Sequence, residues 1–411
     1  MSFVIFIFVW QYAAANNRSL TLLQIEKVAL SQSPEVEQLQ AQASALSEAG
    51  IASGQLPDPK LTLGTMNVPT DTFSLTQEPM TQIQLGLQQS IPRGRSLHYR
   101  SSVQKELSRA TTDKQGVMRL EVLKNVRLIW INLYYWLQTK QILMKEKVTF
   151  QHLQKVTTSM LANNQAQQKD LIRANLELLN IKNSLLEIDQ QIEIIRAELS
   201  RWIGHSLANT ATPKKLPNWP ALPNLINLQH KLIQHPLLKT DTAVISAGRA
   251  GVQLAKQQYK PGLSVGVAYG FRQSNNTNGQ KRANFLTAQL SMDLPFFTHN
   301  RQDRQLKASR EKLVASESGR MSHYNQLNQT LKAQYDTFFQ QKKIFKVYQT
   351  DLIKEAKQYA TSTKIAYQNV QTDFPTLARA YIRQLNVELA ALKTDVNMHA
   401  AHANLLYLEG K

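Results

Sequence analysis

The residues of this chain that could bind a metal ion are few and scattered. His399 and His402 lie one helical turn apart with Met398 beside them, and imidazole and thioether groups are metal ligands. No third ligand is evident near this pair, and His399 falls on an apolar heptad stripe, so a packing role is favoured. Met66 and Met80 are soft donors of the kind that bind Cu(I), but each is isolated. We therefore expect no bound metal and no cofactor.

Catalytic motifs are equally scarce. The chain has no cysteine, which excludes a disulfide framework, a thiolate metal site and a cysteine nucleophile. We find no phosphate-binding loop, no nucleophile elbow and no paired carboxylates, so the sequence favours a protein that is not an enzyme.

Four short stretches with strict alternation dominate the pattern instead. Apolar and polar residues alternate at about 60–67, 81–90, 263–272 and 283–293, which predicts strands with one apolar and one polar face. In the second and third stretches the apolar positions include Ile83, Leu85, Leu87, Val265, Val267 and Tyr269. The opposite positions carry glutamine, serine and glycine, so we expect one face of this small sheet to meet water.

Long helices are predicted at about 96–163, 167–203, 300–368 and 375–409. Two interleaved stripes with heptad spacing, which start at Leu171 and Ala174, indicate a coiled-coil seam. The helix at 96–163 would be roughly 100 Å long at 1.5 Å per residue, far more than a globular domain needs.

The plan of the chain occurs twice. Two pairs of prolines recur 202 residues apart and one pair recurs 203 apart, namely Pro34 with Pro236, Pro59 with Pro261, and Pro92 with Pro295. We predict a first structural repeat at 16–212, a proline-rich crossover at 213–223 and a second repeat at 224–411, each built as strand, strand, long helix and helix.

The chain is strongly basic, with 48 Lys and Arg against 29 Asp and Glu and a net charge of +19. The basic residues are spread along helical faces without a block of like charge, which favours a solvated helix surface over nucleic-acid binding. Residues 1–15 resemble an export signal, with an apolar run at 3–10 followed by three alanines. A buried N-terminal helix is the alternative. No later segment matches a membrane-spanning helix, which needs roughly 20 apolar residues, so any membrane contact must come from the strands.

Four strands cannot close a membrane barrel, because the smallest barrels have about eight. Since open strand edges are not tolerated in lipid, other copies of the chain would have to close them, and a trimer would supply twelve strands. A soluble sandwich explains the alternation but not the long helices, and a basic coiled-coil scaffold explains the helices but not the strands.

Several motifs add a family resemblance. The sequences Leu56-Pro57-Asp58-Pro59 and Gln88-Gln89-Ser90-Ile91-Pro92-Arg93-Gly94, together with Met80-Thr81 and 283–295, resemble the TolC-type outer-membrane efflux proteins, in particular the heavy-metal branch. The resemblance implies a mainly α protein with a small membrane β part, a trimeric twelve-stranded β-barrel continued by an α-helical coiled-coil tunnel. It implies a homotrimer in outer-membrane lipid, a periplasmic adaptor protein, an inner-membrane transporter of the resistance-nodulation-division type, and no nucleic acid. Heavy-metal cations such as copper or silver are the expected cargo, and drugs or other small toxins are the alternative.

The same resemblance assigns places to particular residues. Pro92 and Pro295 would mark the junction of barrel and tunnel, and the six apolar strand residues named above would face lipid. The periplasmic tip, with its gate and adaptor-docking surface, would include Asn163, Asn164, Asp170, Arg173, Tyr367, Asp373, Thr376 and Arg379. Asn164 and Val370 stand where the family commonly has glycine, and Arg173 and Arg379 stand where it often has acids. We therefore expect hydrogen bonds and Arg–Asp pairs, for example Arg379 with Asp373 or Asp170, to hold the gate.

Overall fold

The computed structural model describes residues 20–411, and the expected export signal at 1–15 lies outside this range. The chain divides into two compact units. Among the described residues, unit 1 contains 20–33 together with 119–229 and 330–411, and unit 2 contains 34–118 and 230–329. Each unit takes segments from both halves of the sequence, so the compact units do not coincide with the two repeats that the proline spacing predicts.

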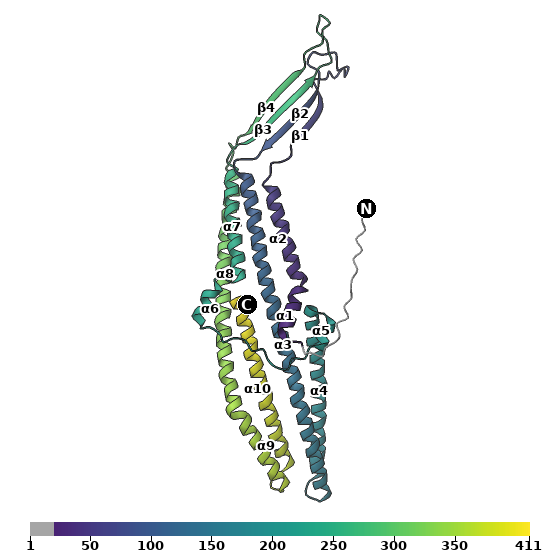
Figure 1. The fold of residues 1–411 in the computed structure, drawn as a ribbon, viewed down its shortest axis with the longest axis vertical. Helices are drawn as coiled ribbons and strands as arrows, with labels where there is room; N and C mark the ends of the chain where they lie inside the picture. The colour runs from purple at the N-terminus through teal and green to yellow at the C-terminus, as the bar shows by residue number, and fades with distance from the viewer. Residues whose placement is uncertain (1–19) are drawn as a thin grey trace. The chain divides into compact units, whose positions relative to one another are not determined.

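Unit 2 contains a four-stranded sheet (Figure 1). Its strands are β1 (Lys60–Met66), β2 (Gln82–Ile91), β3 (Gly262–Phe271) and β4 (Phe285–Asp293), all within two residues of the ranges that the alternation predicts. They lie in the order β1-β2-β3-β4 with every neighbouring pair antiparallel. The central pair, β2 with β3, joins the two halves of the sequence.

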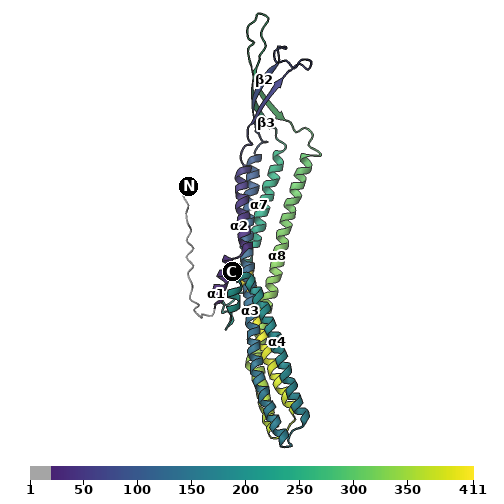
Figure 2. The same ribbon diagram turned by 90° about the vertical axis from the view of Figure 1, so that its right-hand side faces the viewer.

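Helices continue from the strands in unit 2. They are α2 (Pro34–Ser53), α7 (Pro236–Gln257), the first part of α3 (Ser96–Ala162) and the first part of α8 (Gln302–Val347), which run side by side below the sheet in Figure 2. Pro34 and Pro236 are the first residues of their helices, where proline costs no hydrogen bond. A Cβ added at Gly116 of α3 would lie 3.3 Å from Cβ of Pro236, so α3 and α7 pack closely there.

Unit 1 contains the remaining helices. These are α1 (Leu22–Ser31), the rest of α3, α4 (Gln168–Ile203), α5 (His205–Thr210), the rest of α8, α9 (Ile353–Gln368) and α10 (Phe374–Glu409), while the short α6 (Leu225–Leu232) spans the unit boundary. The expected seam of α4 is buried at Ala174, Ile181, Ile188 and Ile195, which confirms the heptad reading for this helix. Near the helix turns a cluster that includes Phe150, Leu153, Leu377 and Phe374 forms a core between α3, α4 and α10.

The structure departs from the sequence prediction at two places. The helix expected at 300–368 is interrupted by a turn of π-helix, η1 (Tyr348–Leu352), between α8 and α9. There the Thr350 hydroxyl donates to the Lys346 carbonyl at 3.0 Å, a side-chain bond that competes with the regular helix pattern. The short helix α5 has no counterpart in the prediction. Within residues 20–411, no helix combines the length and apolar character that crossing a membrane requires.

Candidate functional sites: the two-faced sheet, the strand–helix junction and the paired helix turns

The two faces of the sheet have different chemistry across all four strands. Residues directly opposite each other in antiparallel strands share a face. One such row runs Leu63, Leu85, Tyr269, Leu286, and the next runs Leu61, Leu87, Val267, Ala288. Ile83 and Val265 lie on the same face, two residues along their strands from Leu85 and Val267. Ile83 pairs with Phe271, and Val265 pairs with Leu290. The register therefore places all six residues expected to face lipid on one side of the sheet.

This apolar face is open. Leu63 is 73% exposed and Leu286 is 74% exposed, and both belong to the same cross-strand row. A contiguous exposed patch of such side chains is typical of a surface that contacts another protein or a membrane. The opposite face carries a hollow of about 210 Å³ whose lining includes Gln84, Gln88 and Gln289. Glutamine, serine and threonine there could line an aqueous passage.

The strand–helix junction is basic and tightly built. Gly94, between β2 and α3, has a φ of 49°, and a Cβ there would lie 2.6 Å from Oε1 of Gln257. Glycine suits this position because it tolerates the positive φ and has no side chain to fill the missing space. The side chain of Arg93 donates to the Gln258 carbonyl at 3.0 Å and lies 3.5 Å from the Asp293 carboxylate. Pro92 and Pro295 lie just beyond the ends of β2 and β4, so each strand stops before a proline.

The two helix turns in unit 1 have the same geometry. After α3, Gln165 N–H donates to the Met160 carbonyl and Asn164 N–H to the Leu161 carbonyl, the bond pattern of a Schellman motif. After α9, Gln371 and Val370 donate in the same way to Ala366 and Tyr367. The residues in the left-handed conformation are Asn164, with a φ of 54°, and Val370, with a φ of 58°. These are the positions where the family resemblance leads one to expect glycine, and the geometry explains that preference.

A carboxylate caps the helix after each turn, from the N-cap position of α10 and from the third residue of α4. Asp373 accepts a hydrogen bond from Thr376 N–H at 3.0 Å, and Asp170 accepts one from Gln167 N–H at 3.2 Å. The hydrogen bonds from Thr376 hold the pKa of Asp373 below its ordinary value, with a smaller contribution from Arg379. Both turns therefore present a helix N-terminus with a bound carboxylate.

The cleft between the turns has a volume of about 450 Å³. Its lining includes Asp170, Asp373 and Tyr367, so the structure brings these expected tip residues together. The hydroxyl of Tyr367 lies 3.1 Å from that of Thr157 on α3, and burial is the main reason that its pKa is raised. Asn163 is exposed beside this cleft on the first turn.

The arginines of the tip lie apart from these carboxylates within one chain. Arg379 donates to the Pro375 carbonyl at 3.3 Å and to the Thr376 hydroxyl at 3.2 Å, and it forms no ion pair with a carboxylate of residues 20–411. Arg173 is exposed on α4. An Arg379–Asp373 ion pair is thus not formed within residues 20–411. Instead, Arg379 donates to the Thr376 hydroxyl, and Thr376 N–H donates to Asp373.

One buried carboxylate has no counterpart in the sequence prediction. Glu146 of α3 is 8% exposed, and its Oε1 atom has no hydrogen-bond partner among the described residues. Burial, and then the neighbouring Glu388 carboxylate, raise the pKa of Glu146 to about 7. The signal in the sequence was its spacing, because Glu146 lies between Leu143 and Phe150 on the apolar side of the helix.

The histidine pair of α10 packs against aromatic rings. The ring of His402 lies 5.1 Å from that of Trp219 and 5.2 Å from that of Phe338, measured between centroids. Nδ1 of His399 lies 2.9 Å from the Asp395 carbonyl oxygen. Within residues 20–411, no group of three potential metal ligands comes together. These ring contacts support the packing role for His402.

Comparison with known proteins gives matches at the level of structure. No family model matches the sequence, and no curated protein sequence matches it. The solved structure of the outer-membrane channel OprN has a TM-score of 0.80 at 14% identity, over 95% of this chain and 89% of that one. The outer membrane protein VceC from Vibrio cholerae has a TM-score of 0.79 at 13% identity, over 95% and 96% of the two chains. CusC, described in terms of transmembrane channel formation, has a TM-score of 0.72 at 12% identity, over 94% and 91%.

These similarities extend over nearly the whole of each chain. The chain has the fold of the TolC-type outer-membrane efflux channels.

Proposed function

We propose that this chain is the outer-membrane channel and periplasmic exit duct of a tripartite efflux system, and that it conducts cargo passively out of the cell. The observation that carries the proposal is the four-stranded sheet with one exposed apolar face and one polar face. A sheet of this kind fits a barrel wall with lipid outside and water inside. The export signal expected at 1–15 fits the same location.

The edges of the sheet support a trimer. β1 and β4 are the end strands, so each has one edge that no strand within residues 20–411 covers. In lipid every backbone N–H and C=O must be paired, and neighbouring copies can provide the missing partners. Three copies would form a twelve-stranded barrel, continued by a coiled-coil tunnel of the long helices. The duplicated strand–strand–long helix–helix plan would then place six similar units around the axis.

The remaining partners follow from the same assignment. The two turns at 163–166 and 369–372 would form the periplasmic tip, and their shared Schellman geometry offers each docking partner two similar surfaces per chain. An adaptor protein would dock there and link the duct to an inner-membrane transporter of the resistance-nodulation-division type. No nucleic acid is involved in this proposal.

The cargo we propose from the sequence motifs is a heavy-metal cation such as copper or silver. Drugs and other small toxins are the second candidate, and one observation favours them. Arg173 and Arg379 lie in the helices that follow the two turns, where an acidic ring would attract cations, and both are exposed. Growth of a deletion strain on graded copper, silver and drug concentrations, with and without the gene restored, decides between the two classes.

The gate we propose depends on Arg379 at the tip. Its contacts within the chain hold the guanidinium beside the start of α10, from where it could reach a carboxylate of a neighbouring copy. Arg379→Ala should raise the conductance of the closed channel in a planar bilayer. The exposed Arg310→Ala on α8 serves as the matched control, and equal conductance of the two variants would refute this gate.

A paired substitution tests the barrel itself. Leu85 and Gln84 are neighbours on β2 that point to opposite faces of the sheet. Lysine on the lipid side costs roughly 2–4 kcal/mol near the midplane, so Leu85→Lys should reduce the amount of trimer in the outer-membrane fraction. Gln84→Lys should insert normally and alter only the conductance. Normal insertion of both variants, or a protein that stays in the soluble periplasmic fraction, would instead favour the coiled-coil scaffold or the soluble sandwich.

A further inference from the structure

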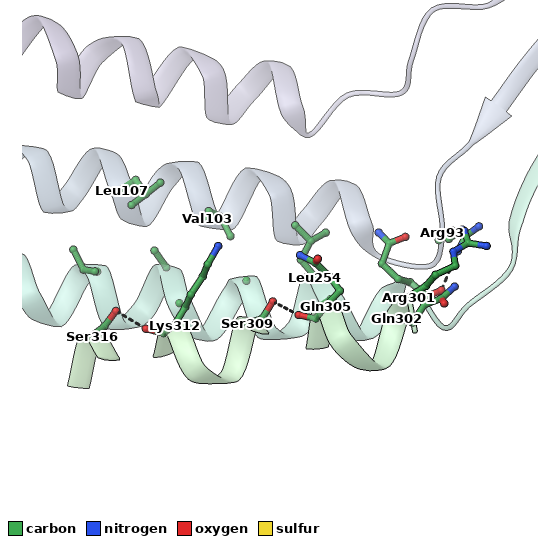
Figure 3. A pocket seen from close by; sticks show the side chains of 16 residues that line it. Arg93, Val103, Leu107, Leu254, Arg301, Gln302, Gln305, Ser309, Lys312 and Ser316 are labelled. Carbon is green, nitrogen blue, oxygen red and sulfur yellow. Dashed lines mark hydrogen bonds between the residues drawn. The ribbon is translucent and has the colours of Figure 1, made fainter. Parts of the chain in front are cut away.

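A large groove runs along the helices of unit 2. It has a volume of about 910 Å³ and lies between α3, α7 and α8, starting at the strand–helix junction (Figure 3). We call it the α7–α8 groove. Its apolar floor is formed by Val103 and Leu107 of α3 and by Val244 and Leu254 of α7. The volume falls in the range of about 300–1,000 Å³ that is typical of small-molecule sites.

The charged side chains of the groove are all cationic. Arg93, Arg301 and Lys312 line it, and no lining residue is a carboxylate. Asp293, outside the lining, lies 3.5 Å from Arg93 and offsets part of that one charge. Figure 3 shows Arg93 and Arg301 together at one end of the groove, with Lys312 further along α8. An apolar floor beside a surplus of cations favours an anionic ligand over a cation or a second, basic copy of this chain.

Two further features of the groove are a buried oxygen without a hydrogen-bond partner and empty space above a glycine. Gln302, the first residue of α8, is 6% exposed, and its buried Oε1 accepts no hydrogen bond from the described chain. Buried polar atoms without a partner are uncommon, and a water molecule held in the groove would satisfy this one. On the opposite wall, a Cβ built at Gly251 of α7 meets no atom within 4 Å, so the space above it is empty.

The groove continues onto the polar face of the sheet. Arg93 and Gln258 also line a second hollow of about 230 Å³, which Ser264 and Ser291 close on the strand side. Ser264 and Ser291 in turn line the hollow on the polar face described above. A chain of shared lining residues therefore leads from the groove to the side of the sheet that carries glutamine and serine.

We propose that the α7–α8 groove is a binding site for amphipathic organic anions, which hold a carboxylate, sulfonate or phosphate head on an apolar body. Arg301 and Arg93 bind the head, and the apolar body lies on Val103, Leu107 and Leu254. Binding itself does not depend on the proposed function. A role in transport does, because the chain of polar lining residues would lead such an anion from the duct into the barrel. The site thereby adds amphipathic anions to the classes of cargo.

Binding is tested by calorimetry on the purified protein in nonionic detergent, with hexanesulfonate as the probe and hexyltrimethylammonium as its cationic match. Hexanesulfonate should bind and the cation should not. Arg301→Gln should weaken sulfonate binding by about tenfold or more, because it removes a hydrogen bond to a charged group. Gly251→Leu should abolish binding by filling the groove with all charges retained. Arg304→Gln, an exposed position of α8 outside the groove, should bind like the unmodified protein.

Three results would overturn the assignment. One is equal binding of the sulfonate and the ammonium probe, and another is an equal loss of affinity in Arg304→Gln. The third is a fall in trimer heat stability in Gly251→Leu with sulfonate affinity unchanged, which would assign the groove to a contact between copies. Conductance in planar bilayers separates the two proposals. A conducting channel without sulfonate binding refutes the anion site alone, and sulfonate binding by a protein that forms no channel refutes the duct alone.

Discussion

The buried carboxylate of Glu146 should make the stability of this protein depend on pH. Glu146 lies on α3 and faces two titratable groups of α10, Glu388 and Tyr381, which interact with it electrostatically. Glu388 itself accepts a hydrogen bond from the Gln384 amide at 3.0 Å and lies 3.7 Å from the ammonium of Lys357 on α9. The cation offsets only part of the Glu388 charge, and Oε1 of Glu146 has no hydrogen-bond partner among residues 20–411.

The sign of the effect follows from the number of protons bound. Burial raises the pKa of Glu146 from 4.5 to about 7, so the folded state holds this proton over a range in which the unfolded chain has lost it. The free energy of unfolding therefore falls as the pH rises from about 4.5 to about 7, by at most about 3 kcal/mol. Below about pH 4.5 both states are protonated, and the contribution of this group no longer changes with pH.

Glu146→Gln keeps the shape of the neutral form and removes the titration. Unmodified protein and variant should unfold at similar temperatures at pH 5, and the variant should be more stable at pH 8 by about 1–3 kcal/mol. Thermal unfolding followed by far-UV circular dichroism in nonionic detergent, at pH values from 5 to 8, measures this difference. The control is Glu198→Gln, at an exposed position of α4. Parallel pH profiles for Glu146→Gln and the unmodified protein would refute the argument, as would the same divergence in Glu198→Gln.

Three further predictions concern the backbone and one buried hydroxyl. Val370→Gly should raise the free energy of unfolding by about 1 kcal/mol, since a β-branched residue with a φ of 58° is strained, whereas Asn164→Gly should change it little; heat unfolding of the two variants checks this. Gly94→Ala should destabilise by about 1–2 kcal/mol because of its positive φ and the close contacts of an added Cβ, while Gly251→Ala, inside a helix with free space, should stabilise by about 0.5–1 kcal/mol. Tyr367→Phe should cost about 1 kcal/mol by leaving a buried threonine hydroxyl without its partner, seen as a lower midpoint in denaturant titrations.

The strands could be predicted because their pattern is local. Alternation over 81–87 was enough to place Ile83, Leu85 and Leu87 on one face, and the observed register confirms that face. Prolines at fixed offsets marked where strands stop and helices begin. The long helices followed from heptad spacing, since the seam residues of α4 are buried where the spacing predicts.

The features that the sequence did not reveal depend on contacts between distant segments. Glu146 is buried because α10 covers it, and nothing near residue 146 in the sequence identifies Glu388 as its neighbour. The α7–α8 groove combines residues more than 200 positions apart, Arg93 and Arg301, and its small residues on α7 read as ordinary helix packing. The turn of π-helix at η1 was missed because the apolar spacing continues through it with no proline or glycine.

The order β1-β2-β3-β4 has a consequence for how cells must make this protein. In the proposed barrel, a single chain in the membrane would expose the outer edges of β1 and β4 to hydrocarbon, so insertion and association with other copies would have to be one event. Assembly should then rise steeply with the local concentration of chains, and newly exported copies need protection until partners arrive. A variant whose edge strand cannot pair would inactivate each proposed trimer that it joins. Such alleles should therefore be dominant over the normal gene.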